Sequence, residues 1–598
     1  MRIARPLRSS LLIGTTLAVS VLLGPLTVPV SAQDGAASAA TSPAPADVVI
    51  FDKTAPNPAA TAPPSDTAAP QPTPAAATEA TPVQAAKPVE DSIGVLVTRR
   101  AMALAGRNAA KDDLAGLTAY YAANPDKPLW IGDTALTQRA RAAIAEIRRA
   151  DEWGLDAREF VLPGKSAAGD RAELIEAEAR LTLAVLKYAR HARGGRLDPT
   201  QLSPSIDRRA QLRDARLILD DIAATEAADA YLRRQHPPHQ QFEKLRRLYN
   251  DLRAGKTPPS ADVAQAPPEP PQDIERGRRR NPQQAAPAPE PVNARRVLVN
   301  MEQWRWMPRD LGKLYVTVNI PEYTLRVVKA GHAIHTERVV VGEVDKQTPI
   351  FSENMQSVVF HPGWGVPNSI KTNELLPGLL RGRDTLSRHG LQVVYRGRPV
   401  DPLSVDWRTT DIRKLDVVQP PGPSNVLGVV KFQFPNKHDV YMHDTPTKNL
   451  FNAEARAFSH GCIRVRNPLR LAEIVFAEDQ GWTPDRVTSL VRGGPQDNKV
   501  MLAHKIPVHI TSFTVVLDET DKPRVYRDIY GFEDRIEMGL AGKTHLIPKP
   551  REETAQVRTA AVGRLAEPRA SYRASGRVVE QRPAPRGGDW VRGVFSGF

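Results

Sequence analysis

The stretch Leu314-Tyr315-Val316-Thr317-Val318-Asn319-Ile320 alternates apolar and polar side chains. A period of two is typical of a β-strand that buries one face in a core. Strand-like patterns recur in residues 339–342, 356–360, 429–434, 440–442 and 508–517, whereas residues 469–476 have helical spacing. We therefore predict a mainly β domain with one or two packed helices at residues 296–540.

Upstream of this domain, residues 89–255 follow a helical period. Leu136, Ala140, Ile144 and Ile147 fall on one apolar stripe, and residues 181–188 and 242–252 carry similar stripes. The expected fold class is therefore α+β multidomain, a helical domain followed by a mainly β domain.

Three other segments have compositions that are unsuited to a core. Residues 33–88 are rich in Ala, Pro and Thr, residues 256–295 are rich in Pro and carry a basic run, and residues 541–598 are basic with little periodicity. Such segments bury too little apolar surface to offset the entropy of ordering. We predict disordered arms at 33–88 and 541–598 and a linker at 256–295.

The N-terminal residues have the pattern of an export signal. Arg2, Arg5 and Arg8 precede an apolar stretch, and small residues ending at Ala32 suit cleavage. A signal peptide at residues 1–32 and an uncleaved membrane anchor are both consistent with this pattern. Either one places the bulk of the protein outside the cytoplasm.

Charge and cysteine content narrow the function classes further. The chain has 81 Lys and Arg against 67 Asp and Glu, a net charge of +14, and a single cysteine, Cys462. One cysteine excludes a disulfide framework, zinc modules with several thiolates and thiolate-held iron–sulfur clusters. Basic runs of this kind are usually solvated faces, and the alternative is attraction to an anionic wall polymer or to lipid head groups. No nucleic acid partner is expected for an exported protein.

Reactive residue types gather around Cys462. The segment Tyr441-Met442-His443 is followed by Ser459-His460-Gly461-Cys462-Ile463-Arg464. A nucleophilic thiol needs a base and backbone N–H donors for the oxyanion. His460 is held by a stiff backbone too close to the thiol, so His443 is the better base, and Gly461 lets the backbone turn. A buried, inert cysteine and a Cys/His/His zinc site are the alternatives.

These residues resemble the active-site signature of YkuD-type L,D-transpeptidases, an upstream His followed by [Ser/Thr]-His-Gly-Cys-x-Arg. Residues 300–306, 318–321, 340–342, 361–370 and 527–531 are similar to the larger YcbB-like branch, whose scaffold domain the helical region resembles. That branch commonly inserts a small peptidoglycan-binding module before the catalytic domain. Residues 256–295 offer only a linker in its place.

The resemblance implies acyl transfer on the peptide stems of peptidoglycan, with no metal or organic cofactor. Cys462 would attack the carbonyl at the L-centre of the third-position diamino acid and release the terminal D-Ala. The thioester would then pass to the side-chain amine of a second stem, giving a 3→3 cross-link. His443 would act as the general base and later as the proton donor.

The resemblance also assigns roles to other residues. Ser459, His460 and Gly461 match the positions that shape the loop and the oxyanion hole, and Tyr441 would aid oxyanion stabilisation. Arg464 would anchor the loop or bind a stem carboxylate. Trp364 and Asn467 would contact substrate, Trp364 together with a cap insertion at about residues 368–420.

Other outcomes stay open at the level of sequence. The acceptor could instead be the N-terminus of an outer-membrane protein, or water, which would give an L,D-carboxypeptidase. The alternative to an enzyme is a wall-associated structural protein that catalyses no reaction. The expected location is the periplasm.

Overall fold

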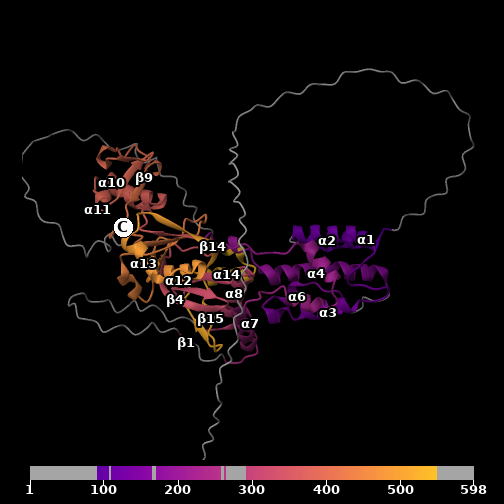
Figure 1. The fold of residues 1–598 in the computed structure, drawn as a ribbon. Coiled ribbons are helices and arrows are strands. Elements are labelled where there is room, and N and C mark those ends of the chain that lie inside the picture. The colour runs from indigo at the N-terminus through magenta and orange to yellow at the C-terminus, as the bar shows by residue number, and fades with distance from the viewer. Residues whose placement is uncertain (1–90, 107–109, 165–169, 258–261, 264–290, 549–598) are drawn as a thin grey trace, which may run out of the picture. The chain divides into compact units, whose positions relative to one another are not determined.

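The computed structural model describes residues 91–106, 110–164, 170–257, 262–263 and 291–548 (Figure 1). The predicted signal peptide, the arm at residues 33–88, most of the linker and residues 549–598 of the tail lie outside these ranges. None of the helices within them is long and apolar enough to span a bilayer.

The helical domain is arranged around one long helix. Its helices are α1 (Ile93–Leu104), α2 (Lys111–Ala123), α3 (Gln138–Arg148), α4 (Arg171–Gly194), α5 (Ala215–Ala223), α6 (Ala228–Arg233) and α7 (Gln240–Arg253). In Figure 1, α1 and α2 lie along one side of α4, and α3 and α6 lie along the other. Leu181, Val185 and Leu186 of α4 are fully buried in the shared core. The predicted helical domain is confirmed.

The β domain is built on a nine-stranded sheet with the order β12-β4-β13-β11-β10-β5-β14-β2-β3. Its strands are β2 (Leu314–Asn319), β3 (Thr324–Lys329), β4 (His332–Gly342), β5 (Ser352–Phe360), β10 (Val430–Gln433), β11 (Met442–His443), β12 (Ala457–Ser459), β13 (Ile463–Val465) and β14 (Asn498–Thr511). Strands β3 and β4 also pair, which closes eight of the strands into a ring. The alternation is confirmed from Val316 to Val318, and Ile320 is also fully buried, whereas Asn319 departs from the pattern because it is only 5% exposed.

Helix α12 (Pro468–Gln480) follows β13 directly and packs on the same core through Leu471, Val475 and Phe476. Proline suits the first helical turn, whose N–H groups lack intrahelical partners, and Gly481 ends the helix with φ of +67°. The helix predicted after the cysteine is therefore present.

The insertion predicted at residues 368–420 is a subdomain with a core of its own. It contains α9 (Asn368–Ile370), the π-helical turn η4 (Lys371–Leu375), α10 (Leu376–Leu380) and α11 (Thr385–Arg388). Strands β7 (Gln392–Tyr395), β8 (Arg398–Val400) and β9 (Asp416–Gln419) join β6 (Trp364–Gly365) in a second sheet, ordered β6-β9-β7-β8. Val366, Leu375, Leu386, Val393 and Val417 form its apolar core. We call residues 364–420 the cap.

Two predicted boundaries are wrong for the residues that flank the β domain. Val292, assigned to the linker, is buried with residues of α7 and α8 (Ala294–Arg305), and β1 (Asp262–Val263) pairs with β16 (Pro523–Val525). Ile547, assigned to the disordered tail, is 7% exposed and packs in the main core beyond α14 (Phe532–Leu540). Single apolar residues among polar ones give no periodic signal, so composition alone misplaced both boundaries.

Candidate active site

Two short strands bring the two halves of the motif together. Strand β11 carries His443 and runs parallel to β13, which begins directly after Cys462. Met442 lies opposite Ile463, His443 lies opposite Arg464, and the Ile463 N–H donates to the Tyr441 carbonyl at 3.0 Å. The expected neighbouring strand for His443 is therefore present.

His443 is held in one tautomer. Its ring is 5% exposed, and Nδ1 lies 2.5 Å from the Asp444 carbonyl oxygen. Because a carbonyl can only accept a hydrogen bond, the proton is on Nδ1 and the lone pair is on Nε2. Burial lowers the pKa of His443 to about 3, and the charge of Arg464 acts in the same direction. The imidazole is neutral and has a basic nitrogen available.

Cys462 is partly buried, and its Sγ lies 3.8 Å from the Asp439 carbonyl oxygen. Burial raises the pKa of the thiol, while hydrogen bonds from the Tyr441 N–H and hydroxyl and the charges of Lys431 and Arg464 act to lower it. The raised pKa keeps the resting side chain as a thiol at neutral pH. It therefore needs a base to become a nucleophile.

The loop before Cys462 is fixed by hydrogen bonds from both sides. Ser459 Oγ donates to the Cys462 carbonyl at 2.6 Å and accepts from the Gly461 N–H at 3.2 Å. Gly461 has φ of +109°, a conformation that side chains disfavour, and its carbonyl accepts from Thr348 Oγ1 at 2.8 Å. The predicted loop-shaping role fits Ser459 and Gly461.

His460 faces the cap. Its Nε2 lies 2.5 Å from Glu374 Oε1 and 2.6 Å from Lys346 Nζ, and Lys346 Nζ lies 3.1 Å from the same carboxylate oxygen. Burial would raise the pKa of Glu374, but His460 and Lys346 outweigh it and lower that pKa. Glu374 lies in η4, so a charged group of the cap meets the motif loop. We call Glu374, His460 and Lys346 the clasp.

Tyr441 connects the thiol to the cap from another side. Burial raises the pKa of Tyr441 well above its usual value, as does the charge of Cys462, whereas a hydrogen bond to Trp364 of β6 acts against both. Lys431 Nζ of β10 lies 4.0 Å from the centre of the Tyr441 ring. The expected placement of Tyr441 and Trp364 beside Cys462 agrees with these contacts.

Arg464 and Asn467 differ in their surroundings. Arg464 is 7% exposed, and burial lowers its pKa to about 10, although the charges of Cys462 and Glu343 favour its charged form. Asn467 instead donates from Nδ2 to Glu337 Oε2 of β4 at 2.7 Å. Its amide fastens the start of α12 to β4, which makes Asn467 the expected substrate residue that the structure does not bring to the thiol.

Sequence reasoning missed Lys431, Glu374, Lys346 and Tyr530. The Tyr530 hydroxyl donates to the Gly342 carbonyl at 2.7 Å and accepts from the Thr348 N–H at 3.2 Å, and so supports the residue that holds Gly461. Strand pairing could have located Lys431, because it lies opposite His443. The two clasp residues outside the motif, Lys346 between β4 and β5 and Glu374 in η4, lie far from it in sequence, and no local pattern marks them.

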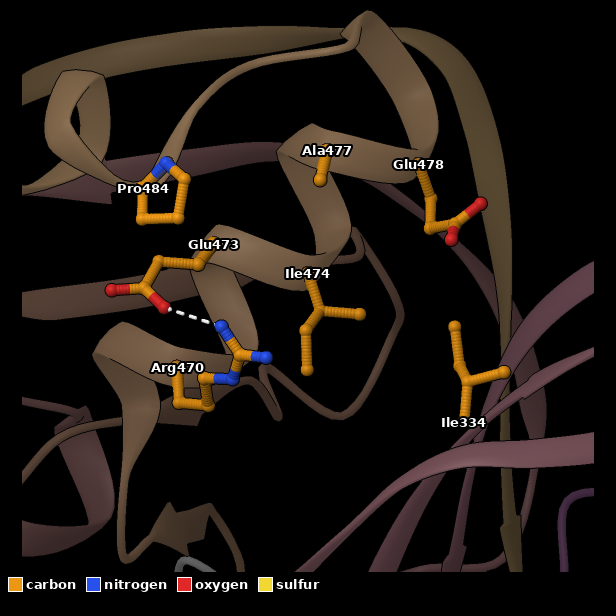
Figure 2. A pocket seen from close by; sticks show the side chains of 7 residues that line it. All are labelled: Ile334, Arg470, Glu473, Ile474, Ala477, Glu478 and Pro484. Atoms are coloured by element: carbon orange, nitrogen blue, oxygen red, sulfur yellow. Dashed lines mark hydrogen bonds and ion pairs between the residues drawn. The ribbon is translucent and has the colours of Figure 1, made fainter.

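A hollow of about 280 Å³ lies between α12, β4 and the start of α13 (Pro484–Gly493) (Figure 2). Arg470 and Glu473 of α12 form an ion pair of 2.9 Å at its wall. None of the predicted site residues lines this hollow, so it is separate from the thiol site.

A metal site is not formed by the predicted residues. In the part of the chain that the structure describes, no three His, Cys, Asp and Glu side chains are grouped to hold one ion. His460 is engaged in the clasp rather than directed with His443 and Cys462 to a common point. His443, His460 and Cys462 therefore do not form a ligand set for zinc in this arrangement.

Comparison with known proteins agrees with this geometry. Residues 313–481 match the family profile described as the L,D-transpeptidase catalytic domain, and residues 115–248 match the profile described as a scaffold domain. A protein of Haemophilus influenzae, itself assigned only provisionally as an L,D-transpeptidase, is 29% identical over 244 residues. This match covers 41% of the present chain and 49% of that relative, so the chain spans about half of its length.

Solved structures of lower similarity include an L,D-transpeptidase from Mycobacterium smegmatis, with 13% identity and a TM-score of 0.16, covering 33% of this chain and 59% of that one. L,D-transpeptidase 1 of Mycobacterium tuberculosis gives 13% identity and a TM-score of 0.13, covering 33% and 62%. The chain carries a YkuD-type L,D-transpeptidase catalytic domain, preceded in sequence by a scaffold domain.

Proposed function

We propose that this protein is a cysteine-dependent L,D-transpeptidase that forms 3→3 cross-links between peptidoglycan stems. The observation that carries the proposal is the tautomer of His443, which leaves the Nε2 lone pair available on the strand paired with that of Cys462. A base fixed in this way can take the proton of a thiol that is not ionised at rest.

Acylation begins when Cys462 Sγ attacks the carbonyl carbon at the L-centre of the third residue of a donor stem. The thiol proton passes to His443 Nε2 as the carbon–sulfur bond forms. The negative charge on the carbonyl oxygen is stabilised by N–H groups of the loop shaped by Ser459 and Gly461, and by the Tyr441 hydroxyl. His443 then protonates the leaving amine of the terminal D-Ala, which leaves a thioester on Cys462.

Deacylation runs in the reverse sense with another amine. The side-chain amine of an acceptor stem attacks the thioester carbonyl, His443 accepts a proton from that amine, and the Cys462 thiolate leaves and is reprotonated. The energy of the cleaved peptide bond is kept in the thioester, so the step needs no cofactor. Water in place of the amine would give the tripeptide product of an L,D-carboxypeptidase.

The cap supports transfer to an amine over hydrolysis. Trp364 and Glu374 connect the cap to Tyr441, which hydrogen-bonds to the thiol, and to His460, which lies two residues before Cys462. Closing a site over a reactive intermediate excludes water from it. We infer that the cap protects the thioester until the acceptor stem, or the N-terminus of an outer-membrane protein, arrives.

The scaffold domain match supports membership of the YcbB-like branch. The arginine-led apolar segment at the N-terminus supports export to the periplasm, where the stems are found. Both assignments are part of the proposal.

The test is intact mass after incubation with a carbapenem, together with analysis of muropeptides. The wild-type protein should gain one adduct and produce cross-linked dimers, whereas Cys462→Ala should do neither and should melt within about 2 °C of wild type, because the thiol is not a main packing element. Cross-linking by the Cys462→Ala variant would contradict the assignment of Cys462 as the nucleophile. A wild-type protein with no adduct and no product would indicate a structural role.

A further inference from the structure

The outer face of the sheet carries a row of cations beside His443. Lys499 and Lys431 both lie opposite Val359 of β5, Lys431 lies opposite His443, and His443 lies opposite Arg464. Side chains at paired positions point to the same face. Their sequence neighbours Phe432, Met442 and Ile463 are fully buried in the core, so the row lies on the other face.

Lys431 is the cation of this row that has two properties together. It lies close to the thiol, and it has no ion-pair partner among the described residues. It is half-buried, and its Nζ lies 4.0 Å from the centre of the Tyr441 ring, whose hydroxyl hydrogen-bonds to Cys462. No carboxylate among the described residues forms an ion pair with Lys431, since Asp439 and Asp497 act on it only at longer range. By contrast, Lys346 pairs with Glu374.

An ammonium in this position destabilises the empty site. Burial lowers the pKa of Lys431, so the charged form is partly desolvated without an ion-pair partner to compensate. A site of this kind gains most from an anion that arrives with the ligand. The donor stem of the proposed reaction carries one, since the residue that leaves ends in a carboxylate.

We propose that Lys431 binds the terminal carboxylate of the donor stem, on the D-Ala that leaves. This assignment rests on the proposed function. The leaving residue has an amine, which His443 protonates, and a carboxylate one Cα away. The amine nitrogen and the carboxylate carbon of one residue lie about 2.5 Å apart, and the paired strands that carry His443 and Lys431 are about 4.8 Å apart, so both ends of the residue lie within reach of these two side chains. His443 and Lys431, directly opposite each other, can thus hold the two ends of one residue.

The first experiment needs no turnover. Cys462 is alkylated with iodoacetate, which carries a carboxylate, and with neutral iodoacetamide, and the ratio of the two rates is measured. In Lys431→Met the ratio should fall about tenfold relative to wild type, whereas Lys431→Arg should keep most of it. Any effect of Lys431 on thiol ionisation changes both rates equally and cancels. An unchanged ratio in Lys431→Met would overturn the carboxylate site.

Lys499→Met is the matched control for the alkylation experiment. It removes the same charge from the same face, two strands farther from His443, and should change the ratio by less than about twofold. Equal falls in Lys499→Met and Lys431→Met would indicate a general field of positive charge rather than a binding residue, and would also overturn the assignment.

The second experiment compares a tetrapeptide donor with the same donor amidated at its C-terminus. Wild type should prefer the free acid about tenfold in kcat/KM, mainly through KM, and Lys431→Met should treat the two donors alike. A preserved preference in Lys431→Met would overturn the inference. If wild type turned over neither donor, the transpeptidase proposal would fail, while the alkylation ratio would still decide whether Lys431 receives a carboxylate.

Discussion

Two clusters of polar side chains in this protein differ in how much of their hydrogen-bonding capacity is used. In the scaffold domain, Glu178 of α4 accepts from the Tyr121 hydroxyl and the Leu129 N–H at one oxygen, and from the Trp130 and Ile131 N–H groups at the other. Every acceptor direction of that carboxylate is used. Around Cys462, by contrast, Lys431 has no ion pair with any residue that the structure describes, and His443 keeps a lone pair on Nε2.

The difference separates a structural role from a chemical one. A buried carboxylate with all its partners in place fixes the segment around Trp130 against α4 and has nothing left for a ligand. Groups that keep an unused donor, acceptor or charge are costly to bury, and such cost is expected where a substrate completes the set. Changes around Cys462 should therefore alter the reaction, whereas changes around Glu178 should alter stability.

The largest effect is expected from His443→Ala. Losing a general base typically lowers the rate by about 10²–10⁴, and acylation by a carbapenem should fall by that much while the melting temperature changes little. Stopped-flow acylation followed by intact mass measures both rate and stoichiometry. If His443→Ala kept the wild-type rate of acylation, another group would have to be the general base.

The pH profile should also reflect the depressed pKa of His443. A pKa of about 3 means that the imidazole is already neutral at pH 5, so lowering the pH from 8 to 5 should not protonate the base. An acid limb in wild-type acylation with a midpoint near 6.5 would show instead that His443 titrates like an exposed histidine.

Much of this arrangement could be predicted from the sequence. The alternation at Leu314 to Ile320 predicted the sheet, and the two halves of the motif predicted Cys462 and a base on a neighbouring strand. The signal was strong because the motif is local and the periods are regular. The ends of the domain were placed less well, since Val292 and Ile547 are single buried residues without a repeating pattern.

The next largest effect should come from the saturated cluster. In Glu178→Gln, an amide nitrogen that cannot accept replaces one carboxylate oxygen. The Leu129 N–H loses its partner inside the core if the nitrogen takes the position facing the Tyr121 hydroxyl, and the Trp130 and Ile131 N–H groups both lose theirs in the other orientation. The expected loss is about 3 kcal/mol in the free energy of unfolding, measured by urea denaturation. A loss below about 1 kcal/mol would contradict the structural role of Glu178.

Glu176→Gln is the matched control on the same helix. Glu176 pairs with Arg100 and Arg180 near the surface of α4, and ion pairs of that kind typically contribute about 0.2–1 kcal/mol. Both variants replace Glu by Gln, so the difference between their losses of unfolding free energy measures the effect of burial and of the complete set of hydrogen bonds around Glu178.

Sequence reasoning could not find the clasp, and the reason is physical. Glu374 meets His460 only because an insertion folds on its own core and returns to the sheet, and no pattern within residues 368–420 indicates which carboxylate will face the motif. His460 was expected to shape the loop, yet Ser459 and Thr348 supply the hydrogen bonds that do so. The clasp therefore gives His460 a role at the edge of the cap.

The smallest effect, and the most selective, is expected from Glu374→Gln. The substitution keeps the shape of the side chain but removes the charge that attracts His460 and Lys346. A charge-assisted contact at a partly exposed site contributes about 1 kcal/mol, so the closed cap should become about fivefold less populated relative to the open one. Acylation by a small carbapenem does not need closure and should stay within about twofold of wild type.

The consequence of an opened cap should appear in the second half of the reaction. With water admitted to the thioester, the ratio of cross-linked dimer to hydrolysed tripeptide should fall about threefold in Glu374→Gln. Asp411→Asn, which removes a cap carboxylate bound to Arg413 within the cap, should leave the ratio unchanged. If Glu374→Gln slowed acylation and transfer equally, the clasp would support the loop rather than the cap. If the ratio stayed at the wild-type value with normal turnover, cap closure would not control the fate of the thioester.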